Sequence, residues 1–440
     1  MPITEPTHGV SIELDGLVDL ADIEEAALDF ARRAPAELVA STVEMLAADL
    51  LDTVVGPFGQ PLRLLDQPEA PWSCTACSSN RGFRRRGRRR GGRKVNSAVG
   101  QVHFDLAQLE CLRCGRRFAP MLQVLGLRAH QRRTDRLGDL AASLAVEVAY
   151  AKAARLLSEL AGVALSARSI RRHVISIAPE RLGPEVDTVP ILLLDGTGVR
   201  AGDAKLGVGL HLAIGLVARR REAGRVVVEA RLLGATLGEG WDTMAGLLAA
   251  VRPGLVIVDG EEELTIMADE LWPAAAVQRC LFHLSKAVQQ LSRYTDRVPL
   301  TAAKALRTRF ERMLVDAYRS GDAAATTTAY EAFVAALDDA GAPAAADHLR
   351  AARPHALTFL TRPDAGRLVF GDKGRAELGT GVLERVMREM NRRTDVGVRW
   401  SLPGARAILM VKLGRKYRHG HWAAPPEPIT QPAARFRLTA

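Results

Sequence analysis

The hydrophobic positions of the chain follow two patterns, helical in the first part and strand-like after about residue 185. From Asp19 to Val55, apolar residues recur every three or four positions among acidic ones, as in an amphipathic helix. The same period runs from Leu137 to Leu160, Gly162 interrupts it, and Ser166 is placed to cap a second helix that reaches Ile177. The first part is therefore expected to be mainly helical.

Short apolar runs typical of buried strands begin at Val189. Strands are expected at Val189–Asp195, Val208–Val217, Val226–Leu232, Leu255–Asp259 and 275–280, with a basic turn at Arg219–Arg221 and helices at Gly240–Val251 and Glu262–Leu271. Three strands, a helix, a strand, a helix and a strand form the order of a ribonuclease H-like sheet. Residues 302–349 return to helical spacing, which predicts a helical insertion in this core at about 286–375. The expected fold class is multidomain α/β.

Length and composition narrow the class of protein. The 440 residues are 48% hydrophobic and 25% charged, which excludes collagen, low-complexity disorder and small disulfide scaffolds. No uncharged apolar run approaches about eighteen residues, so no membrane span is expected. The start, Met1 to Glu5, lacks the cationic and apolar segments of a secretory signal. We therefore expect a cytoplasmic protein associated with the nucleoid.

Charge is distributed unevenly along the chain. Residues 1–70 contain fourteen acidic residues and three arginines, whereas residues 71–140 contain sixteen lysines and arginines and four acidic residues. From Arg385 to the end, twelve lysines and arginines face three acidic residues. This asymmetry indicates a polyanionic partner for the middle and C-terminal parts, although a solvated basic face has the same composition.

Four of the five cysteines form two Cys-x-x-Cys pairs, Cys74 with Cys77 and Cys111 with Cys114. Two such pairs can supply four thiolates to one tetrahedral zinc ion, and Gly115 suits the tight turn that such a site needs. The spacing predicts a zinc ribbon. Disulfides are the alternative, and the expected compartment argues against them.

Two arginine-rich segments are candidate DNA contacts. The run from Arg81 to Lys94, between the cysteine pairs, has nine cations and no acid, and is expected to be a ribbon loop that contacts phosphates. Its candidate DNA-binding residues are Arg84, Arg85, Arg86, Arg88, Arg89 and Arg90. The second segment is the helix after Gly162, where a helix-turn-helix would present Arg168, Arg171 and Arg172 to a groove. An ordinary helical hairpin with a solvated face is the alternative.

Two aspartates close predicted buried strands, each followed by glycine: Asp195 and Asp259. Either residue alone could cap the following helix. On neighbouring strands, however, two carboxylates repel each other unless a hard cation lies between them. Mg²⁺, or Mn²⁺ in its place, is the expected cofactor.

The third acid, Glu384, begins a helix that is followed by an arginine-rich stretch, Trp400 and the pair Gly404-Ala405. This segment resembles the C-terminal signature of bacterial insertion-sequence transposases related to the Mutator superfamily, whose catalytic glutamate begins such a helix. The family's Cys-x-x-His element is similar to Cys280-Leu-Phe-His283. The resemblance covers roughly residues 70–420.

The resemblance implies a DDE-type transposase. Asp195 would bridge two Mg²⁺ ions, and Asp259 and Glu384 would each hold one. The ions would activate a water or a DNA 3′-hydroxyl for attack on a phosphodiester. His283 would contact the scissile phosphate or position the metal ligands. Double-stranded DNA, as transposon ends and target, is the expected partner, and a homo-oligomer on DNA is the expected state.

The sequence thus predicts an acidic helical leader at 1–70, a zinc ribbon at 71–125, a helix-turn-helix region at 126–185, a catalytic domain at 186–425 and a tail at 426–440. Two rivals remain open. One is a zinc-ribbon and helix-turn-helix regulator without catalysis, which would not need three ordered carboxylates. The other is a ribonuclease H-like nuclease that never joins strands.

Overall fold

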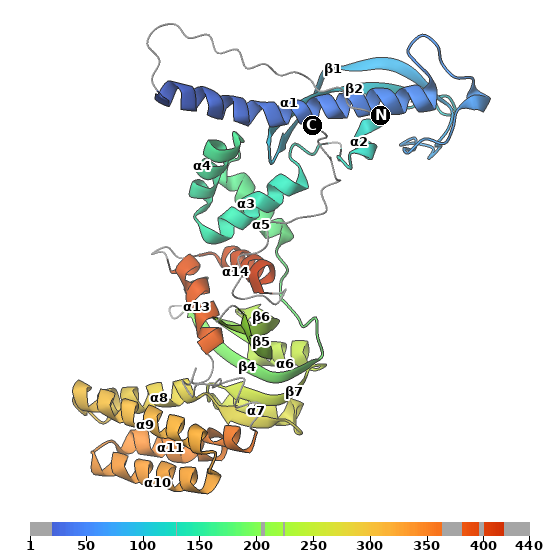
Figure 1. Ribbon diagram of the computed structural model, residues 1–440. Helices are drawn as coiled ribbons and strands as arrows, with labels where there is room; N and C mark the ends of the chain where they lie inside the picture. Colours follow the sequence, from blue (N-terminus) through green and yellow to red (C-terminus); the bar gives the residue numbers. More distant parts are fainter. Residues whose placement is uncertain are drawn as a thin grey trace. The chain divides into compact units, whose positions relative to one another are not determined.

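The computed structural model describes residues 20–128, 130–203, 207–222, 225–362, 381–395 and 400–417. The chain divides into two compact units, 1–173 and 174–440 (Figure 1). The expected tail at 426–440, the first nineteen residues of the acidic leader and the end of the expected insertion lie outside the described residues. The mixed α/β class expected from the sequence is confirmed.

In the first unit, a long helix lies along a small antiparallel sheet. The helix is α1 (Leu20–Val55), and the sheet has the order β1 (Phe83–Ser97), β2 (Gly100–Cys111) and β3 (Arg117–Phe118). Alternate residues of β2 are buried, as in a strand with one face on a core. That core joins the sheet to the apolar side of α1 and to the short helix α2 (Met121–Val124).

The arginine-rich run is a strand, not the expected loop. It forms most of β1 and pairs with β2 from Phe83↔Cys111 to Ser97↔Gly100, with register shifts on either side of Arg88 and Arg89. Acidic partners explain the difference, because a strand with this many cations would otherwise concentrate unbalanced charge on a small sheet.

Three helices follow: α3 (Asp135–Glu147), α4 (Tyr150–Ala161) and α5 (Ala167–Ile177). The single helix expected over Leu137–Leu160 is therefore wrong; it is two helices, because Val148 is extended (φ −130°, ψ 168°) and the chain turns there. The other signals hold. Gly162 ends α4 in the left-handed conformation, and the Ser166 hydroxyl accepts a hydrogen bond from the Ser169 N–H at the start of α5.

The second unit is built on a five-stranded sheet of order β6-β5-β4-β7-β8. Its strands are β4 (Thr188–Val199), β5 (Val208–Glu222), β6 (Arg225–Leu237), β7 (Arg252–Val258) and β8 (Ala276–Arg279). Strands β4, β5 and β6 are antiparallel neighbours, whereas β4, β7 and β8 run parallel. The expected turn at Arg219–Arg221 is wrong: these residues continue β5 and pair with Val226–Val228 of β6.

Both faces of this sheet are covered. Leu192 and Leu194 of β4 pack with helices α6 (Trp241–Leu248) and α7 (Glu262–Leu271). Ile191 and Leu193 face the other way, into a larger core. That core is built with helices α8 (Leu281–Gln290), α9 (Leu300–Ser320), α10 (Ala323–Asp339), α11 (Pro343–Ala356), α13 (Gly381–Thr394) and α14 (Leu402–Tyr417). Helices α9, α10 and α11 fall within the segment expected to be a helical insertion.

Among the described residues, no helix is long and apolar enough to cross a bilayer.

Candidate functional site

The four cysteines of the Cys-x-x-Cys pairs form one cluster in the first unit. Their sulfur atoms all lie within 4.8 Å of one another, and the Sγ atoms of Cys74 and Cys114 are 3.5 Å apart. A tetrahedral zinc site with Zn–S bonds of about 2.3 Å places its sulfurs about 3.8 Å apart. All five cysteines are free thiols, so the disulfide alternative is not what this cluster forms. The cluster could hold a zinc ion.

The two cysteine turns have the same backbone design. In each, the N–H four residues after the first cysteine donates to that cysteine's carbonyl, from Ser78 to Cys74 and from Gly115 to Cys111. Both donors have a positive φ, 56° at Ser78 and 73° at Gly115. The turn aims backbone N–H groups at sulfur, such as that of Ala76 at the Cys74 Sγ (3.5 Å). Such donors favour thiolate, the form that binds zinc.

Burial acts against this at Cys74, because it raises the pKa of the thiol. Hydrogen bonds from the backbone of Ala76 and Cys77 and from the Cys114 side chain outweigh burial, and the pKa of Cys74 falls to about 6. Cys74 is therefore ready to ligate as a thiolate at neutral pH.

Several arginines of β1 already have carboxylate partners. Arg85 pairs with Asp52 of α1, Arg86 pairs with Glu110 of β2, and Arg84 lies 3.7 Å from the same glutamate. The hydrogen bond from Arg86 lowers the pKa of Glu110. The arginines thus lie on both sides of the sheet instead of in one protruding loop. Acidic residues of the leader neutralise part of the arginines' positive charge.

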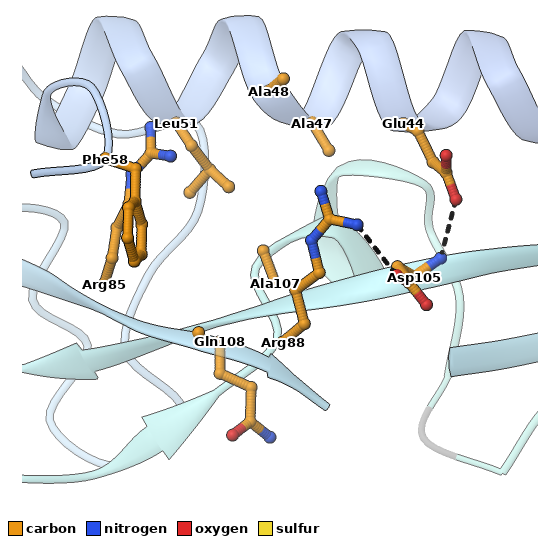
Figure 2. A pocket seen from close by; sticks show the side chains of 11 residues that line it. Glu44, Ala47, Ala48, Leu51, Phe58, Arg85, Arg88, Asp105, Ala107 and Gln108 are labelled. Atoms are coloured by element: carbon orange, nitrogen blue, oxygen red, sulfur yellow. Dashed lines mark hydrogen bonds and ion pairs between the residues drawn. The ribbon is translucent and has the colours of Figure 1, made fainter. Parts of the chain in front are cut away.

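A cavity of about 300 Å³ lies between α1 and this sheet. Figure 2 shows Arg88 reaching across it to Asp105 (2.9 Å), whose backbone N–H donates to Glu44 of α1 (3.2 Å). Arg85 and Phe58 line the same cavity. Within it the guanidinium groups meet carboxylates, the groups with which phosphate would have to compete.

The expected helix-turn-helix arginines lie on α5. Arg168, Arg171 and Arg172 are exposed, while Ile170 between them is fully buried. The side chains of Arg89 and Arg90 lie outside the part of the structure that is described.

The two aspartates of the second unit belong to neighbouring parallel strands. Leu193↔Ile257 is the last pair of the β4–β7 ladder, and Asp195 and Asp259 each follow their residue of that pair by two positions. Asp195 is 3% exposed and lies inside β4, not at its end as expected, because pairing with β5 extends β4 to Val199. Asp259 follows β7 directly, and its Oδ1 accepts the Glu261 N–H (2.9 Å).

Glu384 is brought to the same side of the sheet by α13. Asn391, seven residues further along α13 and so on the same side of the helix, donates to the Thr197 hydroxyl (3.4 Å). Thr197 follows Asp195 by two residues and therefore shares its face of β4. Glu384 itself is partly buried, with Arg388 3.9 Å away.

The charges of Asp259 and Glu384 both act on His283. Burial lowers the pKa of its imidazole, and the charges of Asp259 and Glu384 oppose that shift. Both carboxylates therefore act on one side chain of α8, although they come from β7 and α13. Cys280, at the start of α8, is fully buried in the core.

Three groups at this site escaped the sequence analysis. The Arg279 guanidinium lies against Gly260, which has φ +109° and no room for a Cβ. Burial lowers the pKa of Arg279, and Asp259 raises it. A charged residue at the end of a short buried strand was the available signal. Asn391 lies in the quoted glutamate helix but was given no role.

The third group is a clamp made by Arg393 and Trp400. The Arg393 guanidinium stacks on the indole ring at 4.7 Å, and the indole N–H donates to the Thr394 carbonyl (3.1 Å). Trp400 also pairs with Ala201 just after β4. The tryptophan of the signature thus fastens the end of α13 to the strand that carries Asp195.

The family model "Transposase, Mutator family" matches residues 37–413 of the chain. The match covers most of both units, and the chain belongs to this family. Family membership makes it a transposase-type enzyme that acts on DNA, as the sequence resemblance predicted. A search of the curated proteins found no match.

Proposed function

We propose that residues 174–440 contain a ribonuclease H-like, DDE-type catalytic core that cuts transposon ends and transfers the freed strand to target DNA. The observation that carries the proposal is the register of β4 and β7, which puts Asp195 and Asp259 each two residues beyond the Leu193↔Ile257 pair, together with the contact of α13 with β4 on the helix side that carries Glu384. Further support comes from the strand order of the sheet. Strands β4, β5 and β6 are antiparallel neighbours, and β7 and β8 extend the sheet on the other side of β4, parallel to it.

The three carboxylates suit Mg²⁺ or Mn²⁺, because both ions prefer oxygen ligands. In the described part of the chain, no three carboxylates lie within 4.8 Å of one another, the spacing that a single ion would require. Asp195, Asp259 and Glu384 would together hold a pair of such ions.

The bound ions would activate a water or a DNA 3′-hydroxyl for in-line attack on a phosphodiester. The chain's own residues fix the ligands. Burial in the middle strand holds Asp195, the Glu261 N–H orients Asp259, and the contact of Asn391 with β4 orients α13. His283, whose pKa burial lowers, would donate a hydrogen bond to an oxygen of the scissile phosphate.

DNA binding is proposed for the first unit. A zinc ribbon at 71–125 would hold β1 and its arginines Arg84, Arg85, Arg86, Arg88, Arg89 and Arg90 near phosphates. A helix-turn-helix region at 126–185 would present Arg168, Arg171 and Arg172 of α5 to a groove. Their exposure supports this role. A catalytic domain at 186–425 completes the proposed organisation, and the protein would work on DNA as a homo-oligomer.

The experiment uses the full chain, Mg²⁺ and a labelled duplex that carries the inverted repeats flanking its gene, with a supercoiled plasmid as target. The proposal expects nicks at the repeat ends and label covalently joined to the plasmid. Nicks without joined product would favour a nuclease that never joins strands. Sequence-specific binding with neither product would favour a regulator without catalysis.

A further inference from the structure

A row of cations and one tyrosine lies on the solvent side of α8 and of the π-helical turn that continues it (Leu291–Thr295). The opposite side of this element is buried in the core. We call the row the α8 outer face. It consists of the partly exposed Lys286 and the exposed Arg293, Tyr294 and Arg297, with the exposed amide of Gln290 between them; Arg297 lies just beyond the turn. π-Helical turns within helices occur frequently at functional sites.

The charge of this face is not balanced on the face itself. Between Leu281 and Leu300 the single acid is Asp296. Its carboxylate is used elsewhere, because its two oxygens accept the N–H groups of Ala344 (3.0 Å) and Ala345 (3.4 Å) at the start of α11. The first acid along α9, Glu311, pairs with Arg307 of its own helix (2.7 Å).

Tyr294 is the most exposed part of the row. Its side chain is 79% exposed, and the exposed arginines Arg293 and Arg297 flank it in the sequence. An open aromatic ring beside guanidinium groups is the arrangement on which proteins stack bases of unpaired strands while cations hold the backbone.

The row begins at the proposed catalytic centre. Lys286 follows His283 by three residues, so the two share a side of α8. Burial lowers the pKa of His283, and the neighbouring Lys286 ammonium lowers it further. Tyr294 is eleven residues beyond His283, about 16 Å along a helix, which corresponds to about five stacked nucleotides.

We infer that the α8 outer face binds the unpaired DNA strand that leaves the cleavage site, with phosphates on Lys286, Arg293 and Arg297 and a base stacked on Tyr294. The inference rests on the proposed function, since it takes the strand's starting point from His283. It adds a strand-binding surface that the three carboxylates alone do not require.

The test is binding of the full chain, without added Mg²⁺, to duplexes with an unpaired tail of eight nucleotides that carries 2-aminopurine at the fifth. Tyr294→Ala should weaken binding of the tailed duplex about tenfold and abolish the fluorescence change, because one stacking contact is lost. Tyr294→Phe keeps the ring and should bind like the parent. Neither variant should alter binding of the blunt duplex or of a two-nucleotide tail.

Arg293→Ala tests the cations, with Arg319→Ala as the charge-matched control at the far end of α9, where Arg319 is exposed near Asp316. Only Arg293→Ala should weaken tail binding. The inference is overturned if Tyr294→Ala binds the tail like the parent, or if it loses blunt duplex equally.

Asp259→Asn separates this result from the proposed function. It should abolish cleavage and leave tail binding intact. If Asp259→Asn still cleaves DNA, the catalytic proposal is refuted, but tail binding that depends on Tyr294 would still support the strand-binding surface. If Asp259→Asn is inactive and tail binding does not depend on Tyr294, only the strand-binding surface is refuted.

Discussion

Asp195 on β4 and Asp259 after β7 each lie two residues beyond Leu193↔Ile257, the last pair of these two parallel strands. The first is buried and the second is partly exposed, and each comes from a strand whose apolar residues are fixed in the core. Local backbone order therefore sets the relation between these carboxylates, as a metal-dependent reaction requires.

The cysteine cluster should contain metal. Because four thiolates hold one Zn²⁺ and binding supplies folding free energy, the purified chain should contain about one zinc per molecule. Cys111→Ser should lose the metal and unfold the sheet of β1, β2 and β3, as read by metal analysis and circular dichroism. A zinc-free parent with an intact sheet would contradict the assignment.

The acidic leader should compete with DNA. Asp52→Asn frees Arg85 and should tighten DNA binding several-fold at low salt, since a phosphate no longer displaces a carboxylate. Asp49→Asn is the matched control, because Asp49 is exposed one turn earlier on α1 and the variant has the same net charge. Equal effects in the two variants, measured by fluorescence anisotropy across salt concentrations, would reduce the pairing to a general charge effect.

Replacing Arg84, Arg85 and Arg86 by alanine should flatten the slope of log affinity against log salt by less than about three. The reason is that all three cations have a carboxylate partner, Asp52 for Arg85 and Glu110 for Arg84 and Arg86, which would already offset part of their attraction for phosphate. An unchanged slope in the salt titration would indicate that these arginines form a solvated surface that does not contact phosphates.

Glu389 should stabilise the fold instead of taking part in catalysis. It pairs with Lys412 of α14 (3.4 Å), whose side chain is 3% exposed, and it accepts hydrogen bonds from Lys416 and Tyr417. Glu389→Gln would leave the Lys412 ammonium buried with one partner fewer, so we expect a loss of about 2 kcal/mol in the free energy of unfolding. It is thus a poor neutral control for Glu384. Asp316→Asn, at an exposed pair, should change stability by less than about 0.5 kcal/mol.

The same pair predicts a pH dependence. Burial raises the pKa of Glu389, but the hydrogen bonds from Lys416 and Tyr417 and the charge of Lys412 outweigh it, and the pKa lies below the ordinary 4.5. A depressed carboxyl pKa gives stability that is complete above the unfolded value and is lost as the pH falls through the folded value. The stability difference between the parent and Glu389→Gln, from urea unfolding, should shrink below about pH 4.5. A constant difference down to pH 3 would contradict this.

Much of the second unit was predictable because its strands contain continuous apolar runs. The spacing of Cys74, Cys77, Cys111 and Cys114 likewise predicted a cluster, because four thiolate ligands in two short turns are typical of a zinc site. Gly162 and Ser166 marked helix ends by local chemistry alone.

The errors have tertiary causes. No local signal in Arg84–Arg90 indicates a strand, because its ladder partner β2 and the carboxylates of Asp52, Glu110 and Asp105 that pair with its arginines are remote in sequence or on the partner strand. The position of Asp195 inside β4 depends on pairing with β5. The sequence could not assign roles to Arg279 or Trp400, because each acts through a contact, with Gly260 and Ala201 respectively, that forms only in the folded chain.

The measurement that tests the central claim most directly is Mg²⁺-dependent cleavage of repeat-end DNA by Asp195→Asn, Asp259→Asn and Glu384→Gln. The exposed acids Asp269→Asn and Glu270→Gln, at the end of α7, serve as charge-matched controls. Each substituted ligand should reduce the cleavage rate by at least about 10³-fold while the affinity for end DNA stays within twofold, because the charge that holds the ions is lost without a change of shape. The controls should cut like the parent. Undiminished cleavage by the three ligand variants would contradict the account.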